Sequence, residues 1–160
     1  MKKNNIIFMG TPDFAVESLK VLIKSNYNIL GVVTATDKKR GRGKKISFSP
    51  IKNFAIKNNI PIYQPKNLKS EEFINLMKKI KPDLLVVVAF RMLPEILINI
   101  PKYGSINLHA SLLPNYRGAA PINWVIINGE IETGVTTFFI NKKIDEGDII
   151  NKKKITINED

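Results

Sequence analysis

Short apolar stretches rich in valine, isoleucine and leucine recur along the chain, and between them apolar residues return at helical spacing. Short apolar runs are typical of buried strands, and spacing at i, i+3 and i+4 is typical of amphipathic helices. The expected strands cover residues 5–9, 29–34, 60–63, 83–90, 105–110, 134–140 and 148–157, the last two as a hairpin. The expected helices cover residues 11–25, 52–57, 70–80, 95–98 and 120–127.

Two of these helices have recognisable starts. Thr11, Pro12 and Asp13 supply a capping side chain, a proline for the first turn and an acid near the positive end of the helix dipole. Ser70 precedes a helix whose apolar residues share one face, with Glu72 close behind it. Both signals favour well-defined helices between the strands.

Strands that alternate with helices predict an α/β fold with a doubly wound, mainly parallel sheet. Such sheets bind their ligands in a crevice beyond the carboxyl ends of the strands. Gly10, Arg91, His109 and the 141–147 loop are expected at those ends. The sequence therefore predicts a site assembled from these positions.

A length of 160 residues, 44% of them hydrophobic and 24% charged, is typical of one compact globular domain. The apolar run near the start ends at Met9, too early for a signal-peptide core. The strongest later run, 84–90, meets Arg91, well short of a bilayer-spanning stretch. We expect a cytoplasmic protein without membrane attachment, and a monomer.

The net charge is +11, from 25 Lys and Arg residues against 14 Asp and Glu residues. Such an excess favours a polyanionic partner such as nucleic acid, although abundant Lys, Asn and Ile can equally reflect the base composition of a gene. Residues 36–50, expected to form a loop, concentrate six cations around two glycines. Flexible, cationic segments suit ordering on a phosphate backbone, and a solvated loop is the alternative.

The chain has no cysteine and one histidine, which excludes disulfides, thiolate zinc sites, cysteine nucleophiles and histidine-rich metal sites. No metal is expected. On a strand, Asn107 and His109 share a face, and Ser111 can join them. An amide and an imidazole there can stabilise an oxyanion and transfer a proton.

An imidazole in such a role needs a carboxylate that orients it and favours its protonated form. The late loop offers Asp145, Glu146 and Asp148, and spacing alone does not choose among them. Beside His109, Pro114, Gly118 and Pro121 stiffen a long connection of a kind that is commonly functional in compact domains.

Five segments together resemble the folate-dependent formyltransferase family, and in particular its branch that acts on methionyl-tRNA. They are GTPDFA at 10–15, GRGKK at 41–45, NLHASLLPNYRGAAPINW at 107–124, ETGVTTF at 132–138 and IDEGDI at 144–149. The resemblance spans the chain in the expected order. It implies a Rossmann-like formyltransferase fold and transfer of a formyl group from 10-formyltetrahydrofolate to the methionine of initiator methionyl-tRNA.

Matching positions carry the implied roles. Asn107, His109 and Asp145 correspond to the family's catalytic residues, and Ser111, Leu112, Leu113 and Pro114 to its cofactor-binding segment. Arg40, Arg42, Lys44 and Lys45 lie in the loop that the resembled enzymes bring to the tRNA acceptor end. The resemblance implies one catalytic domain over residues 1–160, which is a fragment or a natural minimal form, without the family's C-terminal β-barrel domain.

Three other functions stay open from the residues alone. The amine acceptor can be another molecule, such as a nucleotide-linked amino sugar, although the basic loop argues against it. A catalytically impaired RNA-binding or folate-binding module is a second alternative, and intact Asn107, His109 and Asp145 argue against that. Hydrolysis of formyltetrahydrofolate, with release of formate and no acceptor, is the third.

Overall fold

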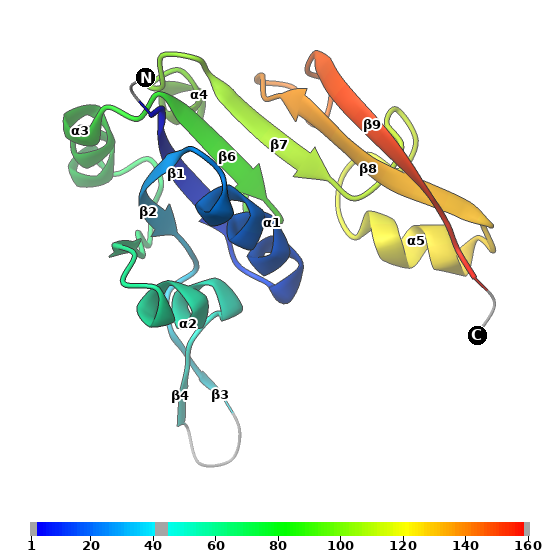
Figure 1. Ribbon diagram of the computed structural model, residues 1–160, viewed down its shortest axis with the longest axis horizontal. Coiled ribbons are helices and arrows are strands. Elements are labelled where there is room, and N and C mark those ends of the chain that lie inside the picture. The colour runs from blue at the N-terminus through cyan, green and yellow to red at the C-terminus, as the bar shows by residue number, and fades with distance from the viewer. Residues whose placement is uncertain (1–2, 41–44, 159–160) are drawn as a thin grey trace. The chain divides into compact units, whose positions relative to one another are not determined.

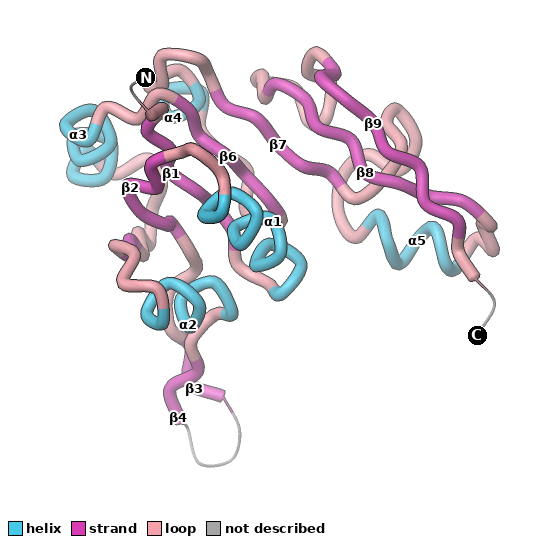
Figure 2. Tube along the Cα trace, viewed as in Figure 1, coloured by secondary structure: helices cyan, strands magenta, loops and turns pink. Residues whose placement is uncertain are grey.

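The computed structural model describes residues 3–40 and 45–158, which fall into two compact units divided at the Ser105–Ile106 peptide bond (Figure 1). The first unit holds a parallel sheet, a short antiparallel pair of strands and four helices, and the second holds antiparallel strands and one helix (Figure 2). The predicted α/β class with a mainly parallel sheet is confirmed.

The sheet of the first unit has the strand order β5-β2-β1-β6, and all its pairings are parallel. Its strands are β1 (Asn5–Gly10), β2 (Asn28–Val33), β5 (Ile62–Tyr63) and β6 (Leu84–Val88). The central pair, β1 and β6, is buried along nearly its whole length, as expected for strands covered on both faces. The uninterrupted apolar runs in the sequence follow from this double burial.

Three helices connect these strands, α1 (Asp13–Lys24), α2 (Pro50–Lys57) and α3 (Glu71–Ile80), and α4 (Glu95–Ile98) follows β6. Helix α1 packs on β1, β2, β6 and α2, whereas α3 packs on α4. Right-handed crossovers place helices on opposite faces of a parallel sheet when the strand order reverses direction, as it does after β5. The predicted double winding follows from that reversal.

Helix α1 begins later than the sequence predicted. Pro12 occupies the cap position, and no side chain caps the helix, so the expected capping role of Thr11 is wrong. Asp13 does stand in the first turn, and the helix ends at Lys24, one residue before the expected Ser25. By contrast, Ser70 caps α3 as predicted, accepting a hydrogen bond from the Phe73 amide.

The expected irregular loop over 36–50 contains a small hairpin. Strands β3 (Lys38–Arg40) and β4 (Lys45–Ser47) pair antiparallel, with Lys39 opposite Ile46. The sequence did not reveal these strands because a run of like charges with two glycines has the composition of a solvated loop. The backbone forms a ladder nonetheless, and α2 begins directly behind it, at Pro50.

The second unit is built on three antiparallel strands that are neighbours in the sheet (Figure 1). They are β7 (Ser105–His109), β8 (Glu132–Phe139) and β9 (Ile149–Thr156), and α5 (Pro121–Ile127) lies between the first two in sequence. The expected hairpin of the last two strands is confirmed. Among the described residues, no helix is long and apolar enough to cross a bilayer.

Ser49 tests how far local capping stabilises the first unit. Its hydroxyl accepts a hydrogen bond from the Lys52 amide at 3.1 Å and lies 2.7 Å from the Thr34 hydroxyl. We expect Ser49→Ala to lower the free energy of unfolding by about 1–2 kcal/mol, since the amide loses its cap and Thr34 its partner. Urea unfolding measures this. Ser70→Ala, which removes a 3.4 Å cap, serves as the comparison and should cost less; a larger loss for Ser70→Ala would contradict the assignment.

Candidate functional site

Asn107 and His109 lie on β7, two residues apart and therefore on the same face of the strand. His109 is only 7% exposed, whereas Asn107 is half-buried. The predicted pairing of an amide and an imidazole on one face is therefore present. Because the histidine is largely buried, the groups around its two ring nitrogens determine what the imidazole can do.

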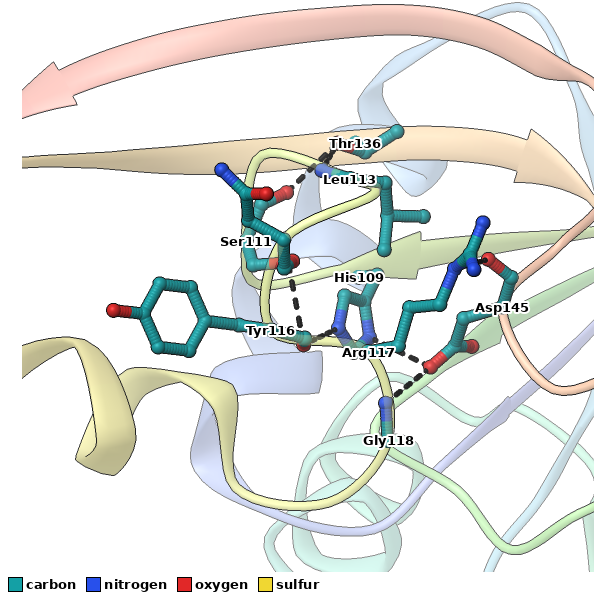
Figure 3. Close-up of polar contacts among 9 residues, drawn as sticks. His109, Ser111, Leu113, Tyr116, Arg117, Gly118, Thr136 and Asp145 are labelled. Carbon is teal, nitrogen blue, oxygen red and sulfur yellow. Dashed lines mark hydrogen bonds and ion pairs between the residues drawn. The ribbon is translucent and has the colours of Figure 1, made fainter.

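Both ring nitrogens of His109 face oxygen acceptors (Figure 3). Nε2 lies 2.8 Å from the carbonyl oxygen of Tyr116, which can only accept, so Nε2 carries a hydrogen. Nδ1 lies 3.7 Å from Oδ2 of Asp145. At this distance Nδ1 is within ion-pair range of the carboxylate but beyond hydrogen-bond range, so Asp145 faces the ring without a direct hydrogen bond to it.

Of the three carboxylates that the sequence left open, the structure brings Asp145 to His109. Its Oδ2 also accepts a hydrogen bond from the Gly118 amide at 2.8 Å, and its backbone carbonyl accepts one from Arg117 Nε at 3.0 Å (Figure 3). Glu146 instead faces two cations, Arg117 at 3.5 Å and Lys143 at 3.4 Å. Asp145 thus joins the loop after β8 to the loop after β7.

The route by which Asp145 reaches His109 differs from the expectation. We expected the 141–147 loop at the same sheet edge as His109, which holds for parallel strands. Strand β8 runs antiparallel to β7, and Phe139 stands opposite Ile106, whereas His109 stands opposite Thr136. The loop therefore leaves the sheet beside the start of β7 and folds back to bring its carboxylate to the end of that strand.

Gly147 makes this return possible. A Cβ atom at this position would lie 1.5 Å from the carbonyl oxygen of Phe139, so no other residue fits without moving the backbone. The Phe139 amide also donates to the carbonyl of Asp148 at 2.9 Å, which closes the base of the loop. Within IDEGD, position 147 therefore requires glycine, two residues after Asp145.

Four positions in the two loops have left-handed backbone conformations. They are Tyr116 (φ 56°), Gly118 (φ 86°), Ala120 (φ 52°) and Asp145 (φ 51°). Non-glycine residues adopt this region rarely, and such strain concentrates at ligand-binding and catalytic sites. The strain here lies at the residues that present the Tyr116 carbonyl and the Asp145 carboxylate to His109.

The segment Ser111–Pro114 follows β7 directly. Ser111 is fully buried, and its hydroxyl donates to the Asn115 carbonyl at 2.6 Å and to the Tyr116 carbonyl at 3.4 Å. Leu113 is buried as well, whereas Leu112 is half-buried and Pro114 exposed. Within this segment, Leu112 and Pro114 are therefore accessible to solvent, whereas Ser111 and Leu113 are not.

Sequence reasoning did not single out Thr136, whose side chain contacts this segment. Its hydroxyl is fully buried, donates to the Ser111 carbonyl at 2.7 Å and accepts from the Leu113 amide at 3.1 Å. Its place within ETGVTTF and the alternating burial of Gly134, Thr136 and Phe138 are the signals that could have indicated it.

The basic segment belongs to the first unit, and its base is held by a network of polar side chains. Lys52 Nζ lies 2.6 Å from Asp37 and 2.8 Å from Gln64 Oε1, and Gln64 Nε2 donates to Asp37 at 2.8 Å. The bonds from Gln64 and Lys52 lower the pKa of Asp37. Backbone pairing places Arg40 opposite Lys45, and the other two expected cations, Arg42 and Lys44, lie outside the described residues.

Two further positions lie at strand ends of the first unit, as expected. Gly10 ends β1, where a Cβ atom would lie 2.7 Å from that of Ala15 and 2.9 Å from the Val88 carbonyl. Gly10 is therefore explained by the close approach of α1. Arg91 follows β6, and its guanidinium donates to the carbonyls of Pro65 and Lys66. Within the part of the chain that is described, no group of three or more acidic or histidine side chains forms a metal site.

Comparison with protein families identifies the family to which the chain belongs. The sequence profile described as formyl transferase matches residues 3–160. The chain belongs to the formyl transferase family. The family resemblance carried by the sequence motifs is thereby confirmed.

Curated relatives in the formyl transferase family are similar over almost the whole chain. Methionyl-tRNA formyltransferase of Bacteroides fragilis is 55% identical over 159 residues, which cover 98% of this chain and 49% of the relative. Methionyl-tRNA formyltransferase of Flavobacterium johnsoniae is 57% identical over 157 residues, 98% of this chain and 50% of the relative. The chain thus spans about half the length of these relatives.

Solved structures of formyl transferases share the fold at low sequence identity. Phosphoribosylglycinamide formyltransferase from Bacillus halodurans superposes with a TM-score of 0.77 at 19% identity, over 98% of this chain and 81% of that one. The corresponding protein from Anaplasma phagocytophilum gives 0.77 at 22% identity, over 98% and 74%. At these identities the similarity establishes the formyl transferase fold alone.

Tyr116 provides a pH test of the loop that faces His109. Its hydroxyl donates to Glu130 at 2.5 Å, which raises the pKa of Tyr116 above 10.0, and a bond from Asn128 opposes the shift. A raised pKa means that this contact stabilises the fold below pH 10 and that the stabilisation disappears as the phenol ionises at higher pH. We expect a tyrosinate absorbance titration to show a component that ionises above the ordinary tyrosine pKa, and Glu130→Ala to remove that component. Glu132→Ala, whose carboxylate pairs with Lys154, is the control; an unchanged titration in Glu130→Ala would contradict the assignment.

Proposed function

We propose that this protein transfers the formyl group of 10-formyltetrahydrofolate to the amino group of methionine on initiator methionyl-tRNA. The observation that supports it most is the placement of Asn107, His109 and Asp145 in one unit, with the imidazole between a carbonyl and the carboxylate. The similarity to curated methionyl-tRNA formyltransferases over 98% of the chain supports the choice of acceptor.

In the proposed reaction, the methionyl nitrogen attacks the formyl carbon and a C–N bond forms while the carbonyl oxygen gains negative charge. The Asn107 amide donates a hydrogen bond to that oxygen, which is the interaction that strengthens in the transition state. The bond between the formyl carbon and N10 of the folate then breaks. Tetrahydrofolate leaves with the proton that the attacking amine loses, so no metal or covalent enzyme intermediate is required.

His109 shares its Nε2 proton with the developing oxyanion and recovers it when the carbonyl reforms and N10 leaves. Because the Tyr116 carbonyl accepts from Nε2, donation to substrate requires that Nε2 exchange this carbonyl for the developing oxyanion. Asp145 holds the other nitrogen during this exchange and keeps the ring in place. The Gly118 amide, which also bonds to Asp145 Oδ2, fixes the carboxylate in turn.

The basic hairpin is proposed to bind the tRNA backbone through Arg40, Arg42, Lys44 and Lys45. Its base is anchored by the bonds among Lys52, Asp37 and Gln64. Contacts to phosphate give salt-dependent affinity with no need for base recognition. Segment Ser111–Pro114 is proposed to contact the folate.

Single-turnover formylation of methionyl initiator tRNA by the full-length protein tests the reaction. We expect His109→Ala to reduce the rate by about 10²–10⁴-fold, because proton transfer is lost, and Asn107→Ala to reduce it by about 10²–10³-fold, because an oxyanion donor is lost. Thermal unfolding checks that each variant is folded. A rate near wild type in His109→Ala would refute the assigned role.

The product identifies the acceptor. Formate released with no amine present would favour hydrolysis, and turnover with an amino sugar in place of methionyl-tRNA would favour the corresponding transferase. Folate binding with no product from any of these acceptors would indicate a binding module.

Charge reversal in the basic hairpin separates tRNA use from folate use. We expect Arg42→Glu combined with Lys44→Glu to raise the KM for methionyl-tRNA at least about tenfold and to reduce the salt dependence of KM, because phosphate contacts are lost. The dissociation constant of 10-formyltetrahydrofolate should stay at the wild-type value. Lys78→Glu combined with Lys79→Glu changes the net charge by the same amount at two exposed lysines of α3, away from the hairpin, and serves as the control. Equal effects of both changes would mean that net charge alone is responsible.

A further inference from the structure

A row of three side chains crosses the sheet of the second unit. Thr136 on β8 pairs in register with His109 on β7 and with Lys152 on β9. Residues directly opposite each other on neighbouring strands project from the same face. The proposed proton donor, a threonine and a lysine are therefore aligned side by side.

The Thr136 hydroxyl uses its donor and an acceptor on the loop that follows β7. It donates to the Ser111 carbonyl at 2.7 Å and accepts from the Leu113 amide at 3.1 Å (Figure 3). Thr136 and Ser111 are completely buried. A buried hydroxyl is needed here, because an apolar side chain would leave both an amide and a carbonyl unpaired away from water.

These two bonds hold the backbone on either side of Leu112. The Leu112 side chain lies over Gly134, two residues before Thr136 on β8: a Cβ atom on Gly134 would lie 2.5 Å from Leu112 Cδ2. Strand β8 thus fixes Leu112 in two ways, through the threonine hydroxyl and through the space that the glycine leaves.

The same segment is held from two more directions. Lys152 Nζ donates to the Leu113 carbonyl, so both backbone polar groups of Leu113 are bound by residues of the row. The Ser111 hydroxyl donates to the Asn115 carbonyl at 2.6 Å, which closes the following turn. Ser111 and His109 also converge on the Tyr116 carbonyl.

We propose that Thr136 is a positioning residue that presets the backbone of Ser111–Pro114 for the folate, with Lys152 holding the same segment from β9. This inference rests on the proposed function, in which that segment contacts the co-substrate. A segment ordered before binding does not lose conformational freedom when the ligand arrives, so affinity is gained without a direct contact. Because Thr136 is paired with His109, the same row aligns the co-substrate segment with the proposed proton donor.

The test compares Thr136→Val with Thr136→Ser in the full-length protein. Valine has nearly the shape of threonine but no hydroxyl, whereas serine retains it. We expect Thr136→Val to weaken equilibrium binding of 10-formyltetrahydrofolate about tenfold and to raise its KM in proportion, while the KM for the amine acceptor is unchanged. Thr136→Ser should restore binding to within about threefold of wild type.

The neighbouring Thr137 supplies a matched control. Its hydroxyl donates to the Asn151 carbonyl at 3.3 Å, on the other face of β8, so Thr137→Val makes the same chemical change away from the segment. Folate binding by this variant should equal wild type. Hydrogen exchange at the Leu113 amide gives an independent measure: protection should fall in Thr136→Val and persist in Thr136→Ser and Thr137→Val.

The outcomes distinguish failure of the proposed function from failure of the positioning role of Thr136. Wild-type protein that binds no folate would refute the proposed function and this inference with it. Wild-type affinity in a folded Thr136→Val variant would overturn the positioning role and leave the proposed function standing. If Thr136→Val does not fold, Lys152→Met takes its place, since Lys152 is exposed: several-fold weaker folate binding would support the role, and unchanged binding would overturn it.

Discussion

The Asp145 carboxylate is the point on which the arrangement around His109 depends. A single oxygen, Oδ2, accepts from the Gly118 amide and faces the imidazole, so one atom ties together two loops that are far apart in the sequence. Without it, the imidazole would keep one partner only, the Tyr116 carbonyl. The position of the His109 ring, the conformation of the loop after β7 and the left-handed backbone of Tyr116, Ala120 and Asp145 are therefore linked.

The antiparallel strands after β7 give this family member two separate routes to one site. Strand β8 contributes Thr136 from within the sheet, where the strand register places it directly opposite His109. The loop after β8 contributes Asp145 by returning along the sheet. A ladder position suits a residue that orders backbone, whereas the returning loop is held at Asp145 by its bonds to Arg117 and Gly118.

Much of the fold could be predicted because burial leaves a pattern in the sequence. The apolar run of β6 and the one-sided spacing of α3 predicted these two elements nearly in full, and the lone histidine at a strand end indicated the candidate site. Other features leave no such trace. The Tyr116 contact is made by a backbone carbonyl, which every residue has, and the choice of Asp145 over its acidic neighbours depends on a loop path that only the antiparallel pairing sets. Strands β3 and β4 were not predicted because their dense positive charge is typical of a solvated loop.

The close fit at Gly147 makes the number of residues in the loop between β8 and β9 as significant as their identity. The bond between the Phe139 amide and the Asp148 carbonyl fixes both ends of this loop, and Gly147 leaves no slack beside it. One residue of extended chain spans about 3.3 Å, several times the tolerance of about 0.5 Å within which a catalytic group must be held. Among related chains that all retain an aspartate at the position of Asp145, the length of the loop between β8 and β9 should therefore distinguish those that are active from those that are not.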